Sequence, residues 1–192
     1  MKVGVLALQG SVIDHINMLN QCEVEPVEVR LPEDVDNIYG LIIPGGESTT
    51  IGKLLVESGL DREIIRKYEL GMPIYGTCAG AILLAKNIIN SKQPKLGLMD
   101  ISIKRNEYGR QIDSFEAELE IEKFEKPFHG IFIRAPIIDA VFNGSHVLSS
   151  FNGHPVLVQQ DNLLVSTFHP ELTKDTRIHK YFVKMIKKSA GY

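Results

Sequence analysis

The sequence of 192 residues predicts a three-layer α/β sandwich, in which a mostly parallel sheet lies between two layers of helices. Short apolar runs alternate with segments of helical spacing in the N-terminal half, and this order is typical of a parallel sheet covered on both faces. Further short apolar runs between residues 99 and 160 are separated by Asn-Gly turns, which indicate added antiparallel hairpins. We expect a single domain over residues 1–192.

The predicted elements follow from apolar runs that end at Gly, Pro or charged residues. The core strands are expected at 3–8, 26–29, 39–43, 73–75 and 163–168. The helices are expected after residue 10, after residue 48, at 61–70, from residue 79 and at 176–188, with loops at 31–34 and 91–95. The hairpin strands are expected at 99–104, 115–121, 128–133, 147–151 and 156–160.

The composition excludes several classes of protein. The net charge of −3 and the lack of a long basic run argue against a nucleic-acid partner. No apolar run reaches the roughly 20 residues of a membrane span, and the chain starts directly with a strand, so we expect no signal peptide and a cytoplasmic protein. Two cysteines do not make a disulfide framework.

Cys78 has the surroundings of a nucleophile. The apolar run at 73–75 stops at Gly76, and an Ala/Leu/Ile-rich helical run begins at Ala79, with Gly80 next to it. This is the cysteine form of the strand–turn–helix elbow that exposes a nucleophile. A helix N-terminus also favours the thiolate form of a cysteine. The alternative is a small buried apolar residue, which describes most cysteines.

His169 and Glu171 supply the groups that a cysteine nucleophile needs. The predicted strand at 163–168 ends in His169-Pro170-Glu171, and Pro170 prevents further strand pairing. The imidazole can accept the thiol proton, and the carboxylate can hold the imidazole in one tautomer. The alternatives are an ordinary histidine at a strand end and a solvated carboxylate.

The turn at Gly45-Gly46 joins a predicted strand to a predicted helix, which we expect Ser48 or Thr49 to cap. Two glycines allow backbone N–H groups to approach a bound oxygen, as in an oxyanion hole. The alternative is a plain Gly-Gly turn before a capped helix.

Together these motifs resemble those of the class I glutamine amidotransferases, and among them those of the glutaminase subunits of pyridoxal 5′-phosphate synthases. The resemblance extends over nearly the whole chain and implies a flavodoxin-like arrangement of the three layers. The motifs are Leu8-Gln9-Gly10, Pro44-Gly45-Gly46-Glu47-Ser48-Thr49-Thr50, Gly76-Thr77-Cys78-Ala79-Gly80, Arg105-Asn106-Glu107-Tyr108-Gly109-Arg110-Gln111, Phe132-Ile133-Arg134-Ala135-Pro136 and Phe168-His169-Pro170-Glu171.

The resemblance also implies the roles of individual residues. It implies a catalytic triad of Cys78, His169 and Glu171. It implies an oxyanion hole at Gly45, Gly46, Ala79 and Gln9. Bound glutamine is expected to contact Gly46, Glu47, Ser48, Arg105, Ile133 and Arg134. Arginine suits the glutamine carboxylate because its guanidinium can bind both oxygens. His15 matches the family pattern, but the sequence assigns it no chemical role.

The expected reaction is hydrolysis of L-glutamine to glutamate through a thioester on Cys78, without a metal or cofactor. The resemblance implies that the ammonia passes to a synthase subunit that makes pyridoxal 5′-phosphate. Three alternatives remain open at this point. They are the glutaminase subunit of another synthase such as imidazole glycerol phosphate synthase, a non-catalytic binding module on the same fold, and a cysteine hydrolase of the DJ-1/PfpI kind.

Overall fold

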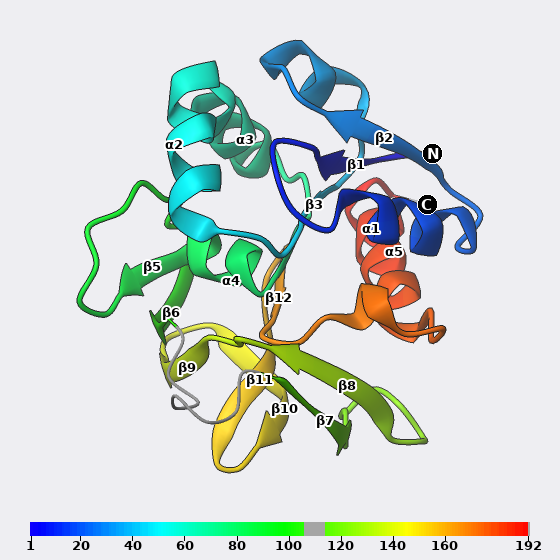
Figure 1. The fold of residues 1–192 in the computed structure, drawn as a ribbon. Coiled ribbons are helices and arrows are strands. Elements are labelled where there is room, and N and C mark those ends of the chain that lie inside the picture. Colours follow the sequence, from blue (N-terminus) through cyan, green and yellow to red (C-terminus); the bar gives the residue numbers. More distant parts are fainter. Residues whose placement is uncertain (106–113, 192) are drawn as a thin grey trace.

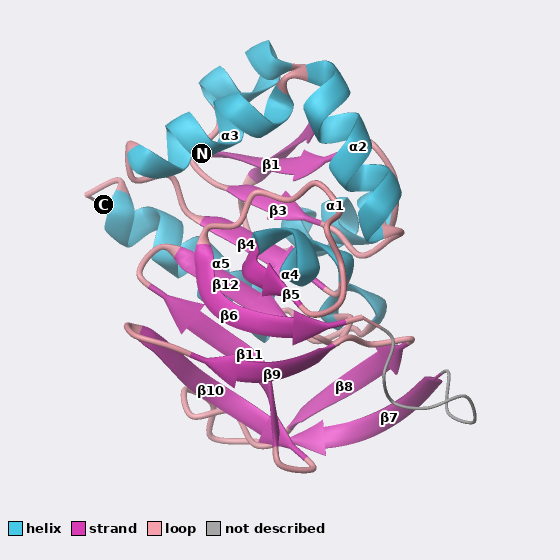
Figure 2. Ribbon diagram, turned by 90° about the vertical axis from the view of Figure 1, so that its left-hand side faces the viewer, coloured by secondary structure: helices cyan, strands magenta, loops and turns pink. Residues whose placement is uncertain are grey.

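The computed structural model describes residues 1–105 and 114–191. Within these residues, seven strands form one sheet in the order β10-β11-β12-β4-β3-β1-β2 (Figure 2). The strands of its parallel part are β1 (Lys2–Leu6), β2 (Glu25–Val29), β3 (Leu41–Ile43), β4 (Ile74–Thr77) and β12 (Leu163–Ser166). β10 (Ser145–Phe151) and β11 (His154–Gln160) extend the sheet as an antiparallel hairpin beside β12.

The parallel strands lie in the order β2-β1-β3-β4-β12, which is the flavodoxin-like order. The predicted α/β fold with a mostly parallel sheet and added antiparallel hairpins is therefore confirmed. In such a sheet, the loops after the carboxyl ends of neighbouring strands meet at one edge, where ligands bind. The segments that follow β1, β3, β4 and β12 contain Gln9, Gly45-Gly46, Cys78 and His169 respectively.

Helices cover both faces of the sheet (Figure 1). One face packs against α1 (Val12–Asn20) and α5 (Arg177–Ser189), and the other packs against α2 (Ser48–Ser58), α3 (Leu60–Glu69) and α4 (Ala79–Leu84). Successive strand residues alternate between the two cores: in β4, Ile74 packs with α2, α3 and α4, whereas Tyr75 packs with α1 and α5. Both side chains are fully buried, because the parallel strands have apolar cover on each side.

Two smaller sheets accompany the seven-stranded sheet in the described residues. β5 (Ala85–Ile88), β6 (Met99–Lys104) and β9 (Ile137–Val141) form one of them. β7 (Ser114–Leu119) and β8 (Phe128–Ile133) form an antiparallel pair. The ring of Phe132 in β8 stacks on the rings of Phe115 and Phe151, which joins this pair to the hairpin of the large sheet.

The predicted elements are wrong at four points. α4 ends at Leu84, and the residues expected to continue it form β5, because Asn87 and Ile88 pair with β6. β9 was not predicted, and it pairs with β6 on the side opposite to β5. Most of the predicted loop at 31–34 belongs to a 3-10 helix, Pro32–Asn37. A second short 3-10 helix, Pro170–Leu172, directly follows His169 and was not predicted.

Within residues 1–105 and 114–191, no helix is long and apolar enough to cross a membrane.

Candidate active site

Cys78 lies at a strained turn between β4 and α4. Its backbone has φ 49° and ψ −99°, a conformation that non-glycine residues rarely adopt. Close packing requires glycine on both sides, since a Cβ on Gly76 would lie 2.5 Å from the backbone of Gly80, and one on Gly80 would lie 2.1 Å from the carbonyl oxygen of Ile43. The turn is held by a 2.8 Å hydrogen bond from the Cys78 N–H to the Ser166 carbonyl of β12. The predicted elbow is therefore present.

The imidazole of His169 is held between Cys78 and Glu171. His169 follows β12, and its backbone N–H donates to the carbonyl of Ile131 in β8 at 2.8 Å. Nδ1 lies 2.7 Å from Oε1 of Glu171, so Nε2 is the ring nitrogen left to interact with the Cys78 side chain. The three side chains of the predicted triad are thus brought together from distant parts of the sequence.

The electrostatics of this group favour an ion pair. Burial alone would lower the pKa of His169, but the hydrogen bonds with Cys78 and Glu171 outweigh burial and raise it to about 10. Burial alone would raise the pKa of Glu171, but the neighbouring His15 and the hydrogen bond from His169 outweigh it and lower the pKa to about 2. At neutral pH, His169 is therefore protonated and Glu171 ionised.

The Gly45-Gly46 loop passes directly over the imidazole. A Cβ on Gly45 would lie 2.5 Å from Cε1 of His169, so only glycine fits at this position. The Gly45 carbonyl accepts a 3.1 Å hydrogen bond from the Ser11 N–H, and Oε1 of Gln9 accepts one of 2.8 Å from the Glu47 N–H. These two contacts hold the loop from the segment between β1 and α1.

Glu47 caps α2, so the prediction that Ser48 or Thr49 would do so is wrong. The Glu47 carboxylate accepts hydrogen bonds from the Thr49 N–H at 3.1 Å and from the Thr50 N–H at 2.7 Å. Its longer side chain reaches both donors from the N-cap position. The hydroxyl of Thr50 is the largest single cause that lowers the pKa of Glu47 to about 2, so this carboxylate is ionised at neutral pH.

Arg105 extends from the end of β6 to the start of α2. Its guanidinium donates to the Thr49 hydroxyl at 3.1 Å and to Oε1 of Gln93 at 2.9 Å, and it lies 3.3 Å from Oε1 of Glu47. Gln93 was not predicted as a site residue, because it lies in the predicted loop at 91–95 and no motif surrounds it. Residues 106–111, the rest of the predicted motif, lie outside the described residues.

The predicted site residues surround a cavity of about 510 Å³. Ala79 and Glu171 are the exceptions: Ala79 follows Cys78 at the start of α4, and the buried Glu171 is bonded to His169 without lining the cavity. Arg134, at φ 43°, reaches the cavity from the end of β8 together with Ile133. The lining also includes residues that the sequence analysis did not select, because no chemical signal marks them: Gly10, Ser11, Ile82 and Leu172.

The other histidines have different surroundings. His15 is fully buried, and its Nε2 lies 3.6 Å from Oε2 of Glu171. His146 is exposed, and His154 is partly exposed. Among residues 1–105 and 114–191, no group of three or more histidine, cysteine or carboxylate side chains is arranged to hold a metal ion.

The chain is similar over nearly its full length to known proteins. The chain is 53% identical over 188 residues to the pyridoxal 5′-phosphate synthase subunit PdxT of Desulforamulus reducens, with 97% of this chain and all of that protein covered. It is 52% identical over 187 residues to the protein of the same name from Moorella thermoacetica, with the same coverage.

A solved crystal structure of a glutamine amidotransferase is also similar. It superposes with a TM-score of 0.93 at 47% identity, over 96% of this chain and 98% of that one. The model of the SNO glutamine amidotransferase family matches residues 5–188. The chain therefore belongs to the SNO glutamine amidotransferase family.

Proposed function

We propose that Cys78, His169 and Glu171 hydrolyse the side-chain amide of L-glutamine. One observation carries the proposal: the strained turn presents Cys78 to the same cavity as His169, whose ring is fixed by Glu171. A nucleophile, a base and a group that orients the base are then in contact, as acyl transfer requires.

The reaction proceeds in two halves. The sulfur of Cys78 attacks the amide carbon, with His169 holding the thiol proton, and a tetrahedral oxyanion forms. His169 gives that proton to the leaving ammonia, and a thioester remains. A water molecule then attacks the thioester as His169 takes its proton, and the proton returns to the sulfur as glutamate leaves.

The oxyanion would be held by backbone N–H groups of the Gly45-Gly46 loop and of Ala79. Both segments adjoin Cys78: a Cβ on Gly45 would lie 3.5 Å from Cβ of Cys78, and Ala79 follows it in sequence. One backbone N–H donor to the oxyanion typically raises kcat by a factor of about 10²–10³. Gln9 would act indirectly, because it holds the loop through the Glu47 N–H.

The rest of the cavity suits the zwitterionic part of glutamine. The guanidinium groups of Arg105 and Arg134 would bind the α-carboxylate, and the ionised Glu47 would attract the α-ammonium group. Gly46, Ser48 and Ile133 complete the wall around the substrate.

As a member of its family, the chain is a glutamine amidotransferase that hydrolyses glutamine for pyridoxal 5′-phosphate synthesis. Its relatives are named as subunits of a synthase, so we infer that the ammonia passes to a synthase subunit of PdxS type. This inference rests on sequence identities of 53% and 52% to these relatives, over nearly the full length of both chains.

The direct test is the Cys78→Ala variant, assayed for glutamate formation in the presence of the synthase subunit. We expect the activity to be lost while the thermal unfolding temperature stays close to that of the wild type. Cys22→Ala is the matched control, because Cys22 is also buried but lies at the end of α1, away from the cavity. Activity that survives in Cys78→Ala would refute the proposed nucleophile.

The coupling to the synthase subunit has its own test. The Gly45 carbonyl accepts a hydrogen bond from the Ser11 N–H, and we propose that a bound partner changes this contact and so reorients the Gly45 peptide. We expect hydrolysis by the free subunit to be slower by about 10²–10³, the contribution of one oxyanion donor. Equal turnover with and without the synthase subunit would contradict this coupling and leave the triad untouched.

A further inference from the structure

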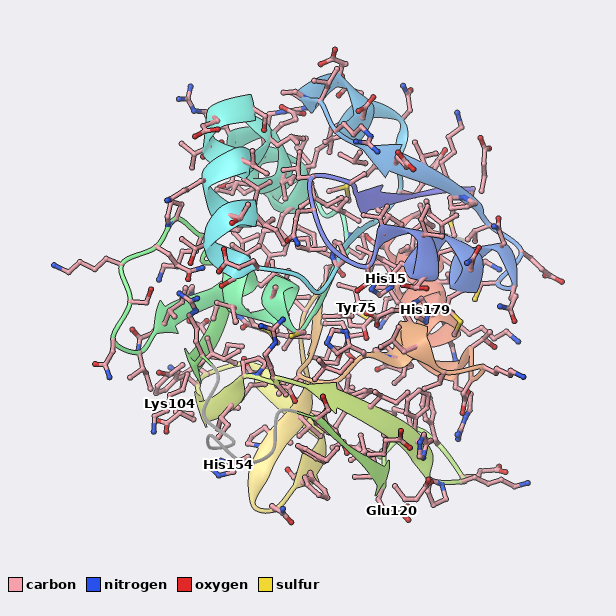
Figure 3. All side chains as sticks on the ribbon, viewed as in Figure 1. His15, Tyr75, Lys104, Glu120, His154 and His179 are labelled. Carbon is pink, nitrogen blue, oxygen red and sulfur yellow. The ribbon has the colours of Figure 1, made fainter. Side chains whose placement is uncertain are left out.

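A buried polar cluster lies behind the proposed triad and does not line the cavity. It consists of His15 from α1, Thr77 from β4 and His179 from α5, and the exposed fraction of each is 0%. Figure 3 shows the His15 and His179 side chains close together beside Tyr75, where α1 and α5 cover the sheet. Buried polar groups are costly unless they are paired, so the contacts of this cluster require an explanation.

The contacts form a continuous path from His179 to Glu171. Nε2 of His179 lies 2.9 Å from Nδ1 of His15. Nε2 of His15 lies 3.2 Å from the Thr77 hydroxyl and 3.6 Å from Oε2 of Glu171. Oε2 is buried and makes no hydrogen bond among the described residues, whereas Oε1 is bonded to His169. The ring of His15 is thus the polar group that faces the second oxygen of the carboxylate.

The contacts also determine the tautomers. Nδ1 of His179 is buried and has no hydrogen-bond partner among the described residues. A proton on that atom would be an unpaired buried donor, which costs about 1–3 kcal/mol. The proton of His179 is therefore on Nε2 and is donated to Nδ1 of His15. The proton of His15 is then on Nε2, where it points toward Glu171 and Thr77.

We propose that His15 is a positioning residue for the reaction, in which the dipole of its Nε2–H faces Oε2 of Glu171 at 3.6 Å and His179 fixes the tautomer of His15. The proposal rests on the proposed function of Cys78, His169 and Glu171. With Oε1 bonded to His169 and Oε2 facing His15, the carboxylate cannot rotate without losing one of these contacts. His169 in turn keeps the orientation in which Nε2 faces Cys78.

The charged and titratable groups around His15 favour this arrangement. Burial lowers the pKa of His15, so the ring is neutral at pH 7 and acts as a dipole whose N–H points at the ionised carboxylate. The groups that face it from the packed elements are Asp14, Tyr75, His169, Glu171 and His179. Tyr75 contacts the ring edge-on, but its hydroxyl bonds to Ser166 and takes no part in the path.

The histidine ring offers a matched pair of variants. Glutamine carries its amide nitrogen at the distal position, where Nε2 of histidine lies, whereas asparagine carries it at the proximal position of Nδ1. His15→Gln therefore keeps a donor toward Glu171, and His15→Asn removes it while the residue remains polar. Both variants lose the ring, so a purely structural role would affect them equally.

The test measures kcat and KM for glutamine hydrolysis in the complex with the synthase subunit, together with thermal unfolding. We expect His15→Asn to lower kcat by about 10-fold, because no N–H dipole then faces the ionised carboxylate, with little change in KM. His15→Gln should retain most of the kcat, and Tyr75→Phe should be unaffected. Equal kcat values for the two His15 variants would overturn the proposal.

The contact between His179 and His15 provides a second, independent pair of variants. His179→Gln keeps a distal donor toward Nδ1 of His15, and His179→Leu removes it. We expect kcat to fall in His179→Leu and to be restored in His179→Gln, even if a His15 variant does not fold. Wild-type kcat in His179→Leu would overturn the role of His179. Cys78→Ala separates the two proposals, since activity in that variant would refute the triad itself.

Discussion

The two sides of the proposed active site differ in how far their charged side chains are exposed to water. On the buried side, the side chains of Glu171 and His15 are both 0% exposed. On the cavity side, the side chain of Glu47 is 50% exposed and that of Arg105 is 35% exposed. Both sides hold an ionised carboxylate, but only the buried one depends on a small, fixed set of partners.

The difference determines what each side can do. Oε1 of Glu171 is bonded to His169, and the loss of this contact leaves a charge without compensation in a dry environment. Glu47 accepts hydrogen bonds from two backbone N–H groups and a hydroxyl, and water can replace any of them. The buried side is therefore suited to fixing the geometry of catalysis, and the cavity side to binding a substrate that enters and leaves.

The largest effect is expected on the buried side. His169→Asn should lower kcat by about 10²–10⁴-fold, because the proton can no longer be moved between sulfur, ammonia and water. Glu171→Gln should cause a smaller loss, since in the proposed reaction this residue orients the base and does not touch the substrate. Steady-state glutamine hydrolysis in the complex measures both.

The double variant His169→Asn/Glu171→Gln sharpens that comparison. Members of one catalytic unit are not additive, so its kcat should be close to that of His169→Asn alone. Losses that multiply would show that the two residues act separately, which would contradict the buried unit described above.

A smaller effect is expected for Arg105 on the cavity side. Arg105→Gln should raise KM for glutamine by about 10-fold, equivalent to one lost charge-assisted hydrogen bond, with a smaller change in kcat. Arg62 is an exposed arginine of α3 and provides the control, since Arg62→Gln should leave both constants unchanged. A loss confined to kcat in Arg105→Gln would place Arg105 in the chemical step instead.

The smallest effect is expected for Glu47 as a helix cap. The pKa of Glu47 falls from 4.5 to about 2 on folding, so its ionised form stabilises the fold above pH 4.5. This contribution is lost as the pH falls toward 2. At pH 7, Glu47→Gln should lower the free energy of unfolding by about 0.5–2 kcal/mol, and the difference from wild type should shrink at pH 3. A difference that grows toward pH 3 in urea unfolding would contradict the capping role.

The sequence was sufficient for the parallel core because local patterns and the fold agree there. The predicted strand at 163–168 is mostly apolar and is followed by His169-Pro170, and every residue of β12 is buried. The sequence was not sufficient at residues 85–88. Their apolar residues suit a helix as well as a strand, and pairing with β6 decides between the two.

Local sequence patterns were likewise sufficient for only some residues of the candidate active site. Cys78, Gly45-Gly46 and His169 could be predicted because each lies where a strand ends, and the edge of a parallel sheet brings such positions together. His179 and Gln93 could not, since one lies in the middle of a helix and the other in a loop. Only the packing of α5 against α1 brings His179 to His15.

The central claim is that the buried side activates Cys78 for glutamine held on the cavity side. A glutamine analogue with an electrophilic carbon in place of the amide tests it directly, with the modified residue identified by mass spectrometry. We expect modification of Cys78 alone, with protection by glutamine and a much slower reaction in His169→Asn. Modification of Cys22, or a rate at Cys78 that does not depend on His169, would contradict the account.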